Sequence, residues 1–426
     1  MQTEFSLAQL ADPANAQSNA ILRACMHCGF CTATCPTYLL LGDELDSPRG
    51  RIYLIKKMLE EDATPAPTTV THIDRCLSCL SCMTTCPSGV HYMHLVDHAR
   101  AYIEDRYRRP SGERLLRKLL AKVLASRGLF RTALRLAPLG RPLRALLPRR
   151  LRAMLESAPA HLPPPGPASR PGVFVAEGVR RARVALLSGC VQPVLSPGID
   201  EAVVRLLTRH GVEVVVASGQ GCCGALAHHL GDERDALALA KTNIAAWEKE
   251  LDGEGLDAVV VSASGCGTVL KDYGFMLRGE PQWAARAARI AALAKDVTEV
   301  LADIGLKAPA IPPGMEIAYH SACSLQHGQR VIDQPRALLA DAGFVVRDIA
   351  EGHICCGSAG TYSMLQPELS GALRDRKLAN IRRTGAAVVA AGNIGCIQHL
   401  AAGGARMVHT AELLDWATGG PKPAAL

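Results

Sequence analysis

Short apolar runs alternate with amphipathic stretches through the second half of the chain. The segments RVALLSGC (183–190), VEVVVAS (212–218) and LDAVVVSASGCG (256–267) contain the short apolar runs that are typical of buried strands. Between them, GIDEAVVRLLTRHG (198–211) and ERDALALAKTNIAAWEKEL (233–251) repeat apolar residues at helical spacing. Strands that alternate with helices predict an α/β unit built on a parallel sheet.

The same order of elements recurs further along the chain. The second copy comprises EIAYHSAC (316–323), QPRALLADAG (334–343), FVVRDI (344–349), HICCGSAG (353–360), ELSGALRDRKLANIRR (368–383) and AAVVAAGNIGC (386–396). A long internal repeat of this kind indicates a duplicated domain. We therefore expect two homologous α/β domains with parallel sheets, at 180–308 and 309–426.

Eight cysteines occupy matching places in the two copies. They are Cys190, Cys222, Cys223 and Cys266, then Cys323, Cys355, Cys356 and Cys396, offset by 133 residues for the first three pairs and 130 for the last. Each follows a predicted strand, and open α/β sheets bind ligands beyond the carboxyl ends of their strands. Four thiols should therefore converge in each copy, as ligands of an iron–sulfur cluster, as zinc ligands or as redox thiols. Core packing of single cysteines would not explain the matched spacing.

The other eight cysteines form two runs near the N-terminus. Both runs follow C-x2-C-x2-C-x3-C-P: Cys25, Cys28, Cys31 and Cys35, then Cys76, Cys79, Cys82 and Cys86. This is the bacterial ferredoxin spacing for [4Fe–4S] clusters, in which the fourth cysteine of each run ligates the other cluster. We expect one cluster on Cys25, Cys28, Cys31 and Cys86, and a second on Cys76, Cys79, Cys82 and Cys35. Structural zinc instead prefers four thiolates from two separated knuckles.

A basic helix is expected between the two runs. LDSPRGRIYLIKKMLE (45–60) has helical periodicity after an expected turn at 48–50. Its basic side chains either offset the negative charge of a thiolate-bound cluster or form a solvated face: Arg49, Arg51, Lys56 and Lys57. Six histidines near the repeated cysteines could assist the chemistry, although a surface or core role is more frequent for any one: His228, His229, His320, His327, His353 and His399.

The segment 111–172 is expected to link the two halves of the chain. Residues 100–156 contain sixteen Lys and Arg against four Asp and Glu, a net of +12 in a chain of net charge +7. The pattern predicts basic amphipathic helices broken at Pro138, Pro142 and Pro148, followed by a Pro-rich connector at 160–172. Such a segment binds an anionic membrane surface or an acidic partner, or forms a solvated bridge. We expect no nucleic-acid partner, because no recognition motif accompanies the charge.

Composition narrows the class of protein. With 426 residues, 48% of them hydrophobic and 20% charged, the chain has the composition of a soluble multidomain protein. Its first twenty residues have no basic start and no apolar run, so we expect no signal peptide and a cytoplasmic location. Sixteen thiols in a reducing compartment favour metal or redox chemistry over disulfides. No window of eighteen apolar residues predicts a membrane span.

These motifs closely resemble one family. The segments 21–60 (ILRACMHCGFCTATCPTYLLLGDELDSPRGRIYLIKKMLE), 76–92 (CLSCLSCMTTCPSGVHY), 221–230 (GCCGALAHHL) and 355–362 (CCGSAGTY) are similar to the iron–sulfur subunits of bacterial glycolate oxidases. The resemblance spans nearly the whole chain. It implies an α+β multidomain fold, in which a helical, bacterial-type 2×[4Fe–4S] ferredoxin domain at 1–110 precedes two cysteine-rich CCG domains.

The resemblance also implies a function. The chain would be an electron-transfer subunit of an oxidoreductase, working with FAD-binding glycolate oxidase subunits and a quinone or other non-NAD acceptor. It would lie peripherally on the cytoplasmic face of the inner membrane, carry no catalytic residue, and bind neither flavin nor glycolate. GQGCCG (219–224) matches a dinucleotide-binding loop in glycine spacing, but the second copy, GHICCG, lacks the middle glycine, which favours a cysteine motif.

Related families leave alternatives open. The iron–sulfur subunits of anaerobic glycerol-3-phosphate and D-lactate dehydrogenases have a similar layout, as do heterodisulfide reductases, whose CCG repeat ends in C-x-x-C. Here Ala263 and Asn393 stand where the first cysteine of that pair would be. Their presence weakens the alternative of a thiol/disulfide enzyme, whereas four ligands per repeat still suffice for one ordinary cluster.

Overall fold

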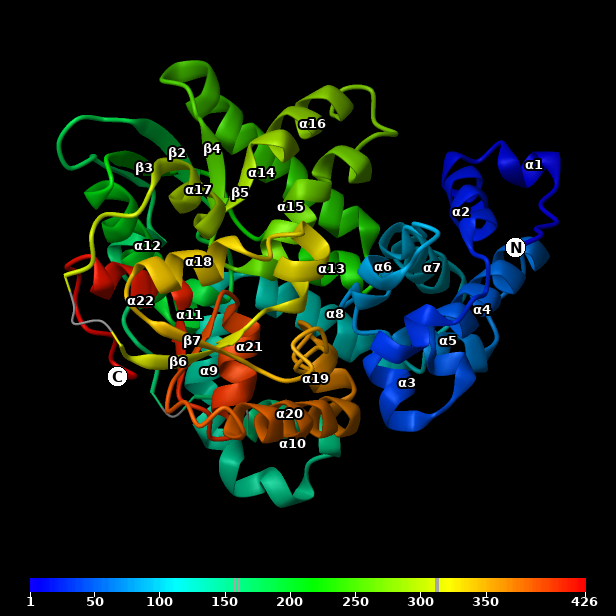
Figure 1. The fold of residues 1–426 in the computed structure, drawn as a ribbon. Helices are drawn as coiled ribbons and strands as arrows, with labels where there is room; N and C mark the ends of the chain where they lie inside the picture. Colours follow the sequence, from blue (N-terminus) through cyan, green and yellow to red (C-terminus); the bar gives the residue numbers. More distant parts are fainter. Residues whose placement is uncertain (157, 160, 311–313) are drawn as a thin grey trace.

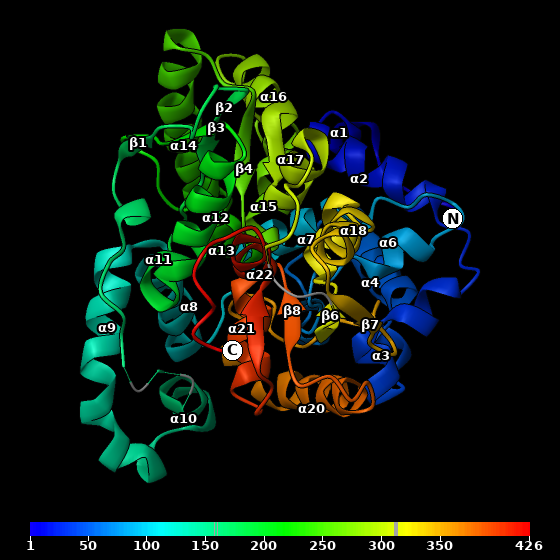
Figure 2. The ribbon, with the colours of Figure 1, turned by 60° about the vertical axis from the view of Figure 1, so that its left-hand side comes forward.

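The chain folds into a helical N-terminal part and a larger part that contains two sheets (Figure 1). The computed structural model describes residues 1–156, 158–159, 161–310 and 314–426. In Figure 1 the N-terminal helices lie on one side and both sheets on the other. Figure 2 shows the connecting helices along the edge of the two-sheet part.

Short helices build the N-terminal part. They are α1 (Leu7–Leu10), α2 (Pro13–Ala24), α3 (Pro36–Leu41), α4 (Pro48–Glu61), α5 (Pro67–Asp74), α6 (Ser81–Thr85) and α7 (Tyr92–Arg106), with the 3₁₀ turns η1 (Phe30–Thr34) and η2 (Glu44–Asp46). Proline opens α2, α3, α4 and α5, since its fixed φ suits the first helical position. The turn expected at 48–50 is wrong: Pro48 is the first residue of α4, and the Ser47 hydroxyl accepts a hydrogen bond from the Gly50 amide.

Two sheets support the two cysteine repeats and share one four-strand order, to which the first sheet adds the edge strand β1. The first contains β1 (Gly172–Phe174), β2 (Ala182–Leu186), β3 (Val212–Val216), β4 (Ala258–Val261) and β5 (Ala294–Asp296), in the order β1-β3-β2-β4-β5. The second contains β6 (Glu316–His320), β7 (Val345–Asp348), β8 (Val389–Ala391) and β9 (Met407–His409), in the order β7-β6-β8-β9. Neighbouring strands are parallel except for β1, which pairs antiparallel with β3 at the edge of the first sheet. That antiparallel strand was not expected from the sequence.

Helices cover both sheets and join them. The first repeat has α11 (Gln192–Leu195), α12 (Pro197–Arg209), α13 (Ala225–His229), α14 (Glu233–Gly253), α15 (Ser264–Met276), α16 (Ala284–Leu293) and α17 (Val297–Ile304). The second has the π-helical turn η5 (Ser324–Gln329), α18 (Gln334–Asp341), α19 (Tyr362–Leu365), α20 (Pro367–Arg382), α21 (Ile394–Ala401) and α22 (Thr410–Ala417). One apolar core contains Val203 and Leu207 of α12 together with Leu413 and Leu414 of α22. The two repeats therefore fold against each other.

The basic linker packs along the repeats. It forms α8 (Ser111–Ala125), α9 (Arg127–Gly140), the 3₁₀ turn η3 (Arg141–Leu146) and α10 (Arg149–Glu156), and the turn η4 (Pro167–Ser169) follows. The break predicted at Pro138 is wrong, because α9 continues through Pro138 to Gly140. Pro138 lies in the last turn of the helix, where its missing backbone N–H costs a single hydrogen bond. Residue 160 of the expected Pro-rich connector lies outside the described residues. Of the helices that the structure describes, none combines the length and apolarity needed to cross a bilayer.

Candidate metal centres

The eight N-terminal cysteines line two neighbouring cavities. Cys25, Cys28, Cys31 and Cys86 line the first, of about 420 Å³ including its opening to solvent, with Cys82 also in its wall. Cys35, Cys76, Cys79 and Cys82 line the second, of about 320 Å³. The fourth cysteine of each run thus lies with the first three of the other run. Pro48, Cys82 and Tyr92 line both cavities, so the two sites are adjacent.

Both cysteine loops adopt the same unusual backbone conformation. His27 and Gly29 in the first run have φ of 53° and 87°, and the corresponding Ser78 and Leu80 in the second have φ of 49° and 62°. Left-handed conformations are costly for residues other than glycine. Their recurrence at matching positions shows that the backbones of the two loops curve around their cavities in the same way.

Arginine, rather than lysine, carries the positive charge at these cavities. The buried Arg51 donates from Nη1 to the Cys35 sulfur at 3.8 Å, and it pairs with the fully buried Asp46 at 3.2 Å. Arg49 lines the first cavity. The two lysines instead form ion pairs along α4, Lys56 with Glu60 and Lys57 with Glu61. Of the four basic residues considered from the sequence, Arg51 donates to a cysteine sulfur, whereas the Arg49 guanidinium pairs with Glu44 at the edge of the first cavity.

Burial disfavours the ionised form of three thiols in these cavities. Burial raises the pKa of Cys79 and of Cys82 well above the ordinary thiol value, and burial raises the pKa of Cys31 to about 11. Metal binding deprotonates such thiols, because the cation offsets the charge that burial disfavours. An all-sulfur donor set in two adjacent cavities fits a pair of iron–sulfur clusters.

The first repeat brings its four cysteines together at the ends of three strands. Cys190 follows β2, Cys222 and Cys223 follow β3, and Cys266 lies in α15 after β4. Cys190 hydrogen-bonds Cys222, Cys222 hydrogen-bonds Cys223, and Cys223 hydrogen-bonds Cys266. Hydrogen bonds from Cys190 and Cys223 lower the pKa of Cys222 and raise the pKa values of the two donors.

The second repeat gathers its cysteines in the same order. The Cys323 sulfur lies 3.7 Å from that of Cys355, and Cys356 hydrogen-bonds both Cys355 and Cys396. The buried ammonium of Lys377 donates to the backbone oxygen of Glu351 at 2.6 Å, and its charge acts on Cys355 and Cys356. Each repeat is therefore a compact group of four thiols.

The glycine after each cysteine pair cannot be replaced without strain. Gly224 and Gly357 have φ of 87° and 95°, and their amides donate to the sulfurs of Cys222 and Cys355 at 3.5 and 3.4 Å. A Cβ on Gly224 would lie 2.9 Å from the backbone oxygen of Ala236, and one on Gly357 would lie 2.6 Å from that of Ser370. The C-C-G sequence thus combines two thiols with the one residue that can turn its amide back towards them.

The second ferredoxin cavity adjoins the second repeat. Cys79 and Cys355 belong to one buried apolar cluster with Leu77, Ile354 and Tyr362, and Cys323 packs against it. The cluster that contains Cys223 and Cys266 consists of first-repeat residues alone. Thiols of the second cavity therefore share a buried apolar cluster with thiols of the second repeat.

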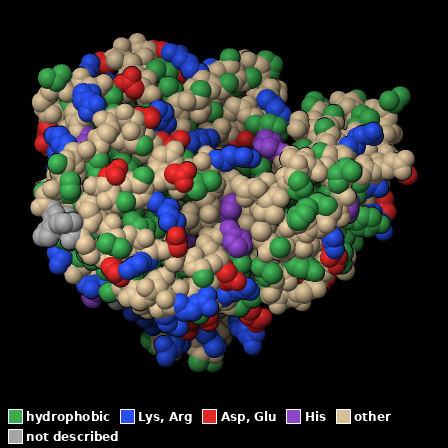
Figure 3. Space-filling model, in the orientation of Figure 1, with side chains coloured by type: hydrophobic (Ala, Val, Ile, Leu, Met, Phe, Trp, Pro, Cys, Tyr) green, Lys and Arg blue, Asp and Glu red, His purple; other side chains and the backbone are tan. Residues whose placement is uncertain are grey.

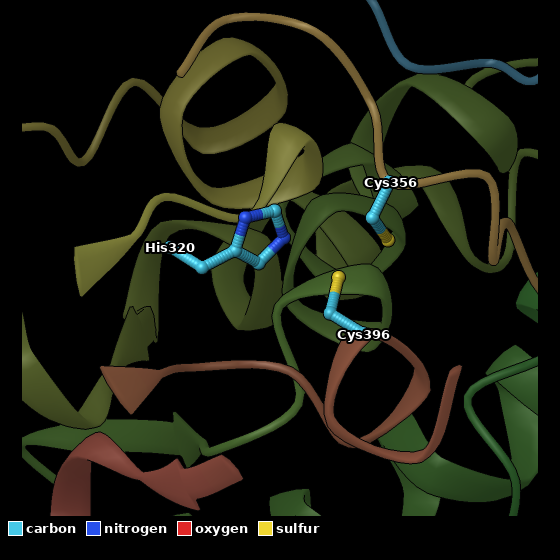
Figure 4. Close-up of side chains that lie close together, drawn as sticks. All are labelled: His320, Cys356 and Cys396. Atoms are coloured by element: carbon cyan, nitrogen blue, oxygen red, sulfur yellow. The ribbon is translucent and has the colours of Figure 1, made fainter. Parts of the chain in front are cut away.

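Five of the six histidines considered from the sequence contact groups other than the thiols of a repeat. His327 and His399 bond Thr84 and Ser370, and His228 and His229 face Asp97. The backbone oxygen of His353 contacts the His327 ring. His320 differs, because its ring lies beside Cys356 and Cys396 (Figure 4). The signal in the sequence was YHSAC, where the first copy has LLSGC.

Comparison with known proteins agrees with this arrangement. Residues 21–90 match the family model of a 4Fe-4S dicluster domain, and residues 184–271 and 317–401 each match that of a cysteine-rich domain. The chain is 41% identical to the glycolate oxidase iron-sulfur subunit of Escherichia coli (strain K12), over 98% of this chain and 99% of that protein. It is 33% identical to the probable glycolate oxidase iron-sulfur subunit of Bacillus subtilis (strain 168), over 93% and 94% of the two chains.

A more distant relative matches part of the chain. Lactate utilization protein A of Bacillus licheniformis is 29% identical over 55% of this chain and 99% of its own length. The matched domains confirm the predicted fold class, a ferredoxin-type domain followed by two cysteine-rich domains. Because two relatives above 30% identity are covered almost from end to end, the chain belongs to the family of glycolate oxidase iron–sulfur subunits.

Proposed function

We propose that this chain is the electron-transfer subunit of a complex that oxidises glycolate to glyoxylate. It would pass single electrons from the flavin of an FAD-binding partner subunit to a quinone or another acceptor that is not NAD. The substrate and the flavin partner are inferred from the names of the relatives and the resemblance of the motifs.

The observation that carries the proposal is that three groups of thiols are adjacent in space. The first cavity shares Pro48, Cys82 and Tyr92 with the second, and the second contacts the second repeat through Cys79 and Cys355. A [4Fe–4S] cluster supplies one-electron transfer when bound. Cys25, Cys28, Cys31 and Cys86 would hold one cluster, and Cys35, Cys76, Cys79 and Cys82 the other.

A division of labour follows from the chemistry. Oxidising a 2-hydroxy acid removes two electrons, whereas an iron–sulfur protein transfers one at a time, and a flavin connects the two modes. The chain's own residues would hold the redox groups, bury the second site more deeply than the first, and offset the charge through Arg51. The acid–base chemistry on glycolate would belong to the partner.

The linker offers a surface for peripheral attachment to the cytoplasmic face of the membrane. Leu136, Leu139 and Leu146 are 57%, 74% and 82% exposed, among arginines of α9, η3 and α10. Figure 3 shows basic and hydrophobic side chains side by side along the lower edge of the molecule, where Figure 1 places α10. Exposed leucines within a basic surface suit an anionic lipid interface.

Metal analysis tests the cofactor content. Chain purified without oxygen should contain at least about eight irons and eight acid-labile sulfides, from the two ferredoxin cavities. About sixteen of each would mean that each repeat also holds a cluster of its own. Fewer than about eight in fully loaded protein would contradict the ligand assignment.

Deletion tests the function. Removing this chain from cells should abolish glycolate-dependent dye reduction by membranes, and re-expression should restore it. Unchanged activity in the deletion strain would contradict the proposal. The same assay with D-lactate or glycerol 3-phosphate distinguishes the substrates of the related dehydrogenases.

A further inference from the structure

His320 is buried without a partner, beside two cysteines of the second repeat. Its ring is 2% exposed, and Cys356 and Cys396 are 1% and 2% exposed. A ring nitrogen of His320 and the two sulfurs all lie within 4.8 Å of one another. Figure 4 shows the ring and both sulfurs converging, from the end of β6, from the loop after β7 and from α21. Among the residues that the structure describes, neither nitrogen of His320 has a hydrogen-bond partner.

An ordinary core histidine looks different in this fold. His409 is fully buried, yet its Nε2 bonds the Ser262 backbone oxygen at 2.8 Å and its Nδ1 accepts from the Ala411 amide at 3.1 Å. Buried polar atoms normally find partners in this way. An imidazole with two unpartnered nitrogens beside two thiols therefore points to a missing ligand rather than to packing.

The first repeat provides an internal comparison. Counting back the 133 residues that separate Cys190 from Cys323, Leu187 stands at the place of His320. Leu187 is 3% exposed and packs in the apolar cluster that contains Cys223. The described residues of the first repeat contain no corresponding trio of donors. The two repeats thus differ at one equivalent position, where the first has the apolar Leu187 and the second has the potential ligand His320.

The other close group of potential donors in the described chain is already satisfied. Asp43, Asp46 and His72 lie together, but Asp46 is paired with Arg51 at 3.2 Å and with Arg75 at 2.8 Å. Those two cations neutralise the carboxylate. Near His320, by contrast, the buried ammonium of Lys377 acts on the ring by its charge alone, because it donates its hydrogen bond to the backbone oxygen of Glu351.

We propose that His320, Cys356 and Cys396 bind one metal ion of the zinc or iron(II) class. Imidazole and thiolate are the usual ligands of both ions. Ligands at about 2.0–2.3 Å from one tetrahedral ion lie roughly 3.5–3.8 Å apart. The three donor atoms lie within 4.8 Å of one another, so small side-chain movements would bring them to that spacing. The Asn393 amide donates to the Cys396 sulfur at 3.4 Å and so orients that ligand. The inference goes beyond the proposed function and needs no assumption about glycolate.

The experiment uses the full chain, purified without oxygen and then offered Zn²⁺ alone or Fe²⁺ alone. X-ray absorption of the zinc-loaded chain should show a nitrogen scatterer at about 2.0–2.1 Å together with sulfur at about 2.3 Å. For the chain loaded with ⁵⁷Fe²⁺, Mössbauer spectra should show a high-spin ferrous doublet that is distinct from the signals of the clusters. The ion that binds more tightly identifies the metal.

Three variants define the ligand. H320L introduces the residue of the first repeat and should weaken binding of the ion at least about tenfold, with loss of the nitrogen signal. C396S should weaken binding of the same ion. H399L, which replaces a histidine whose ring bonds Ser370, should leave binding of the ion unchanged. Equal iron in the ferredoxin cavities of all variants shows that they fold. Unchanged binding in H320L, or sulfur-only scattering in the wild-type chain, would overturn the proposal without affecting the assigned electron-transfer role.

Discussion

The imidazole of His228 in α13 lies 3.2 Å from the carboxylate of Asp97 in α7, measured from Nε2 to Oδ2. The pair joins the helical N-terminal part to the first cysteine repeat, and both side chains are largely buried there. Burial alone would raise the pKa of Asp97 and lower that of His228, but their mutual attraction outweighs it in both cases. The pair therefore acts as an ionic tie between two parts of the fold.

Replacing Asp97 should loosen this tie. D97N leaves a buried imidazole beside an amide, and breaking a buried pair by removing one partner costs about 3 kcal/mol. Chemical denaturation of the anaerobic holoprotein should show that loss. E104Q, a change in the same helix at a more exposed carboxylate, serves as the control. Equal stability of D97N and the wild type would show that the pair contributes nothing.

The contribution of this pair should depend on pH. The folded-state pKa of His228 is raised above 6.5, so its stabilisation is complete below about pH 6.5 and is lost as pH rises through the folded value. The folded-state pKa of Asp97 is lowered below 3.8, so its stabilisation is present above that pH and is lost as pH falls through the folded value. The stability difference between wild type and D97N should thus be largest between about pH 4 and 6.5 and shrink at higher pH. A difference that does not change from pH 5 to pH 9 would contradict the assignment of charge to His228.

Arg51 should tune the second ferredoxin site. Its guanidinium contacts the Cys35 sulfur, and R51M should lower the reduction potential there because a nearby cation favours the reduced, more negative state. Coulomb's law at an effective dielectric constant of 20 limits the change to about 4 kcal/mol, or roughly 170 mV for one electron. K57M, which removes an exposed charge paired with Glu61, should leave the potential unchanged. An unaltered potential in R51M, measured by EPR-monitored redox titration, would contradict this role.

Gly357 should be less replaceable than another glycine with a similar backbone. G357A combines positive φ with a close contact to the backbone oxygen of Ser370, whereas Gly385 has φ of 73° and open space around its Cα. Positive φ alone costs about 1–3 kcal/mol. G357A should exceed G385A in destabilisation and also reduce the metal content of the second repeat. Equal unfolding free energies for the two variants would contradict the packing argument.

The exposed leucines of the linker should carry membrane attachment. L139E/L146E should reduce sedimentation of the holoprotein with anionic vesicles at least about tenfold, because both side chains lose burial in the interface. L7E, at a leucine that is 88% exposed but lies in α1, is the matched control. Vesicle binding of the double variant equal to that of the wild type, or binding that does not change with ionic strength, would contradict attachment through this surface.

Sequence patterns were sufficient where local chemistry decides structure. The apolar run VEVVV was predicted as a strand and forms β3. The cysteine spacings predicted four groups of thiols, two in the N-terminal runs and one in each repeat. The three-residue strands β5 (AKD) and β9 (MVH) escaped prediction because each pairs with β4 or β8 without an apolar run of its own. Tertiary packing, not local pattern, also selected Arg51 for burial and brought Asp97 to His228.

The sequence predicted which cysteines lie together, but not which other polar groups lie beside them. Spacing alone ranked the six histidines equally, and only the assembled fold separates His320, which faces two thiols, from His399, which bonds Ser370. The apolar cluster that contains Cys79 and Cys355 likewise joins residues 276 positions apart. No local periodicity reports a contact of that kind.

This chain should receive electrons from glycolate only through a partner subunit. To test this, the complex is purified through an affinity tag on this chain, and the isolated chain is prepared separately. Glycolate is added to each sample in the absence of oxygen, and the visible absorbance of the iron–sulfur clusters is recorded. The account predicts bleaching in the complex and none in the isolated chain, which dithionite should still bleach. Bleaching of the isolated chain by glycolate, or a complex containing flavin that glycolate does not bleach, would contradict it.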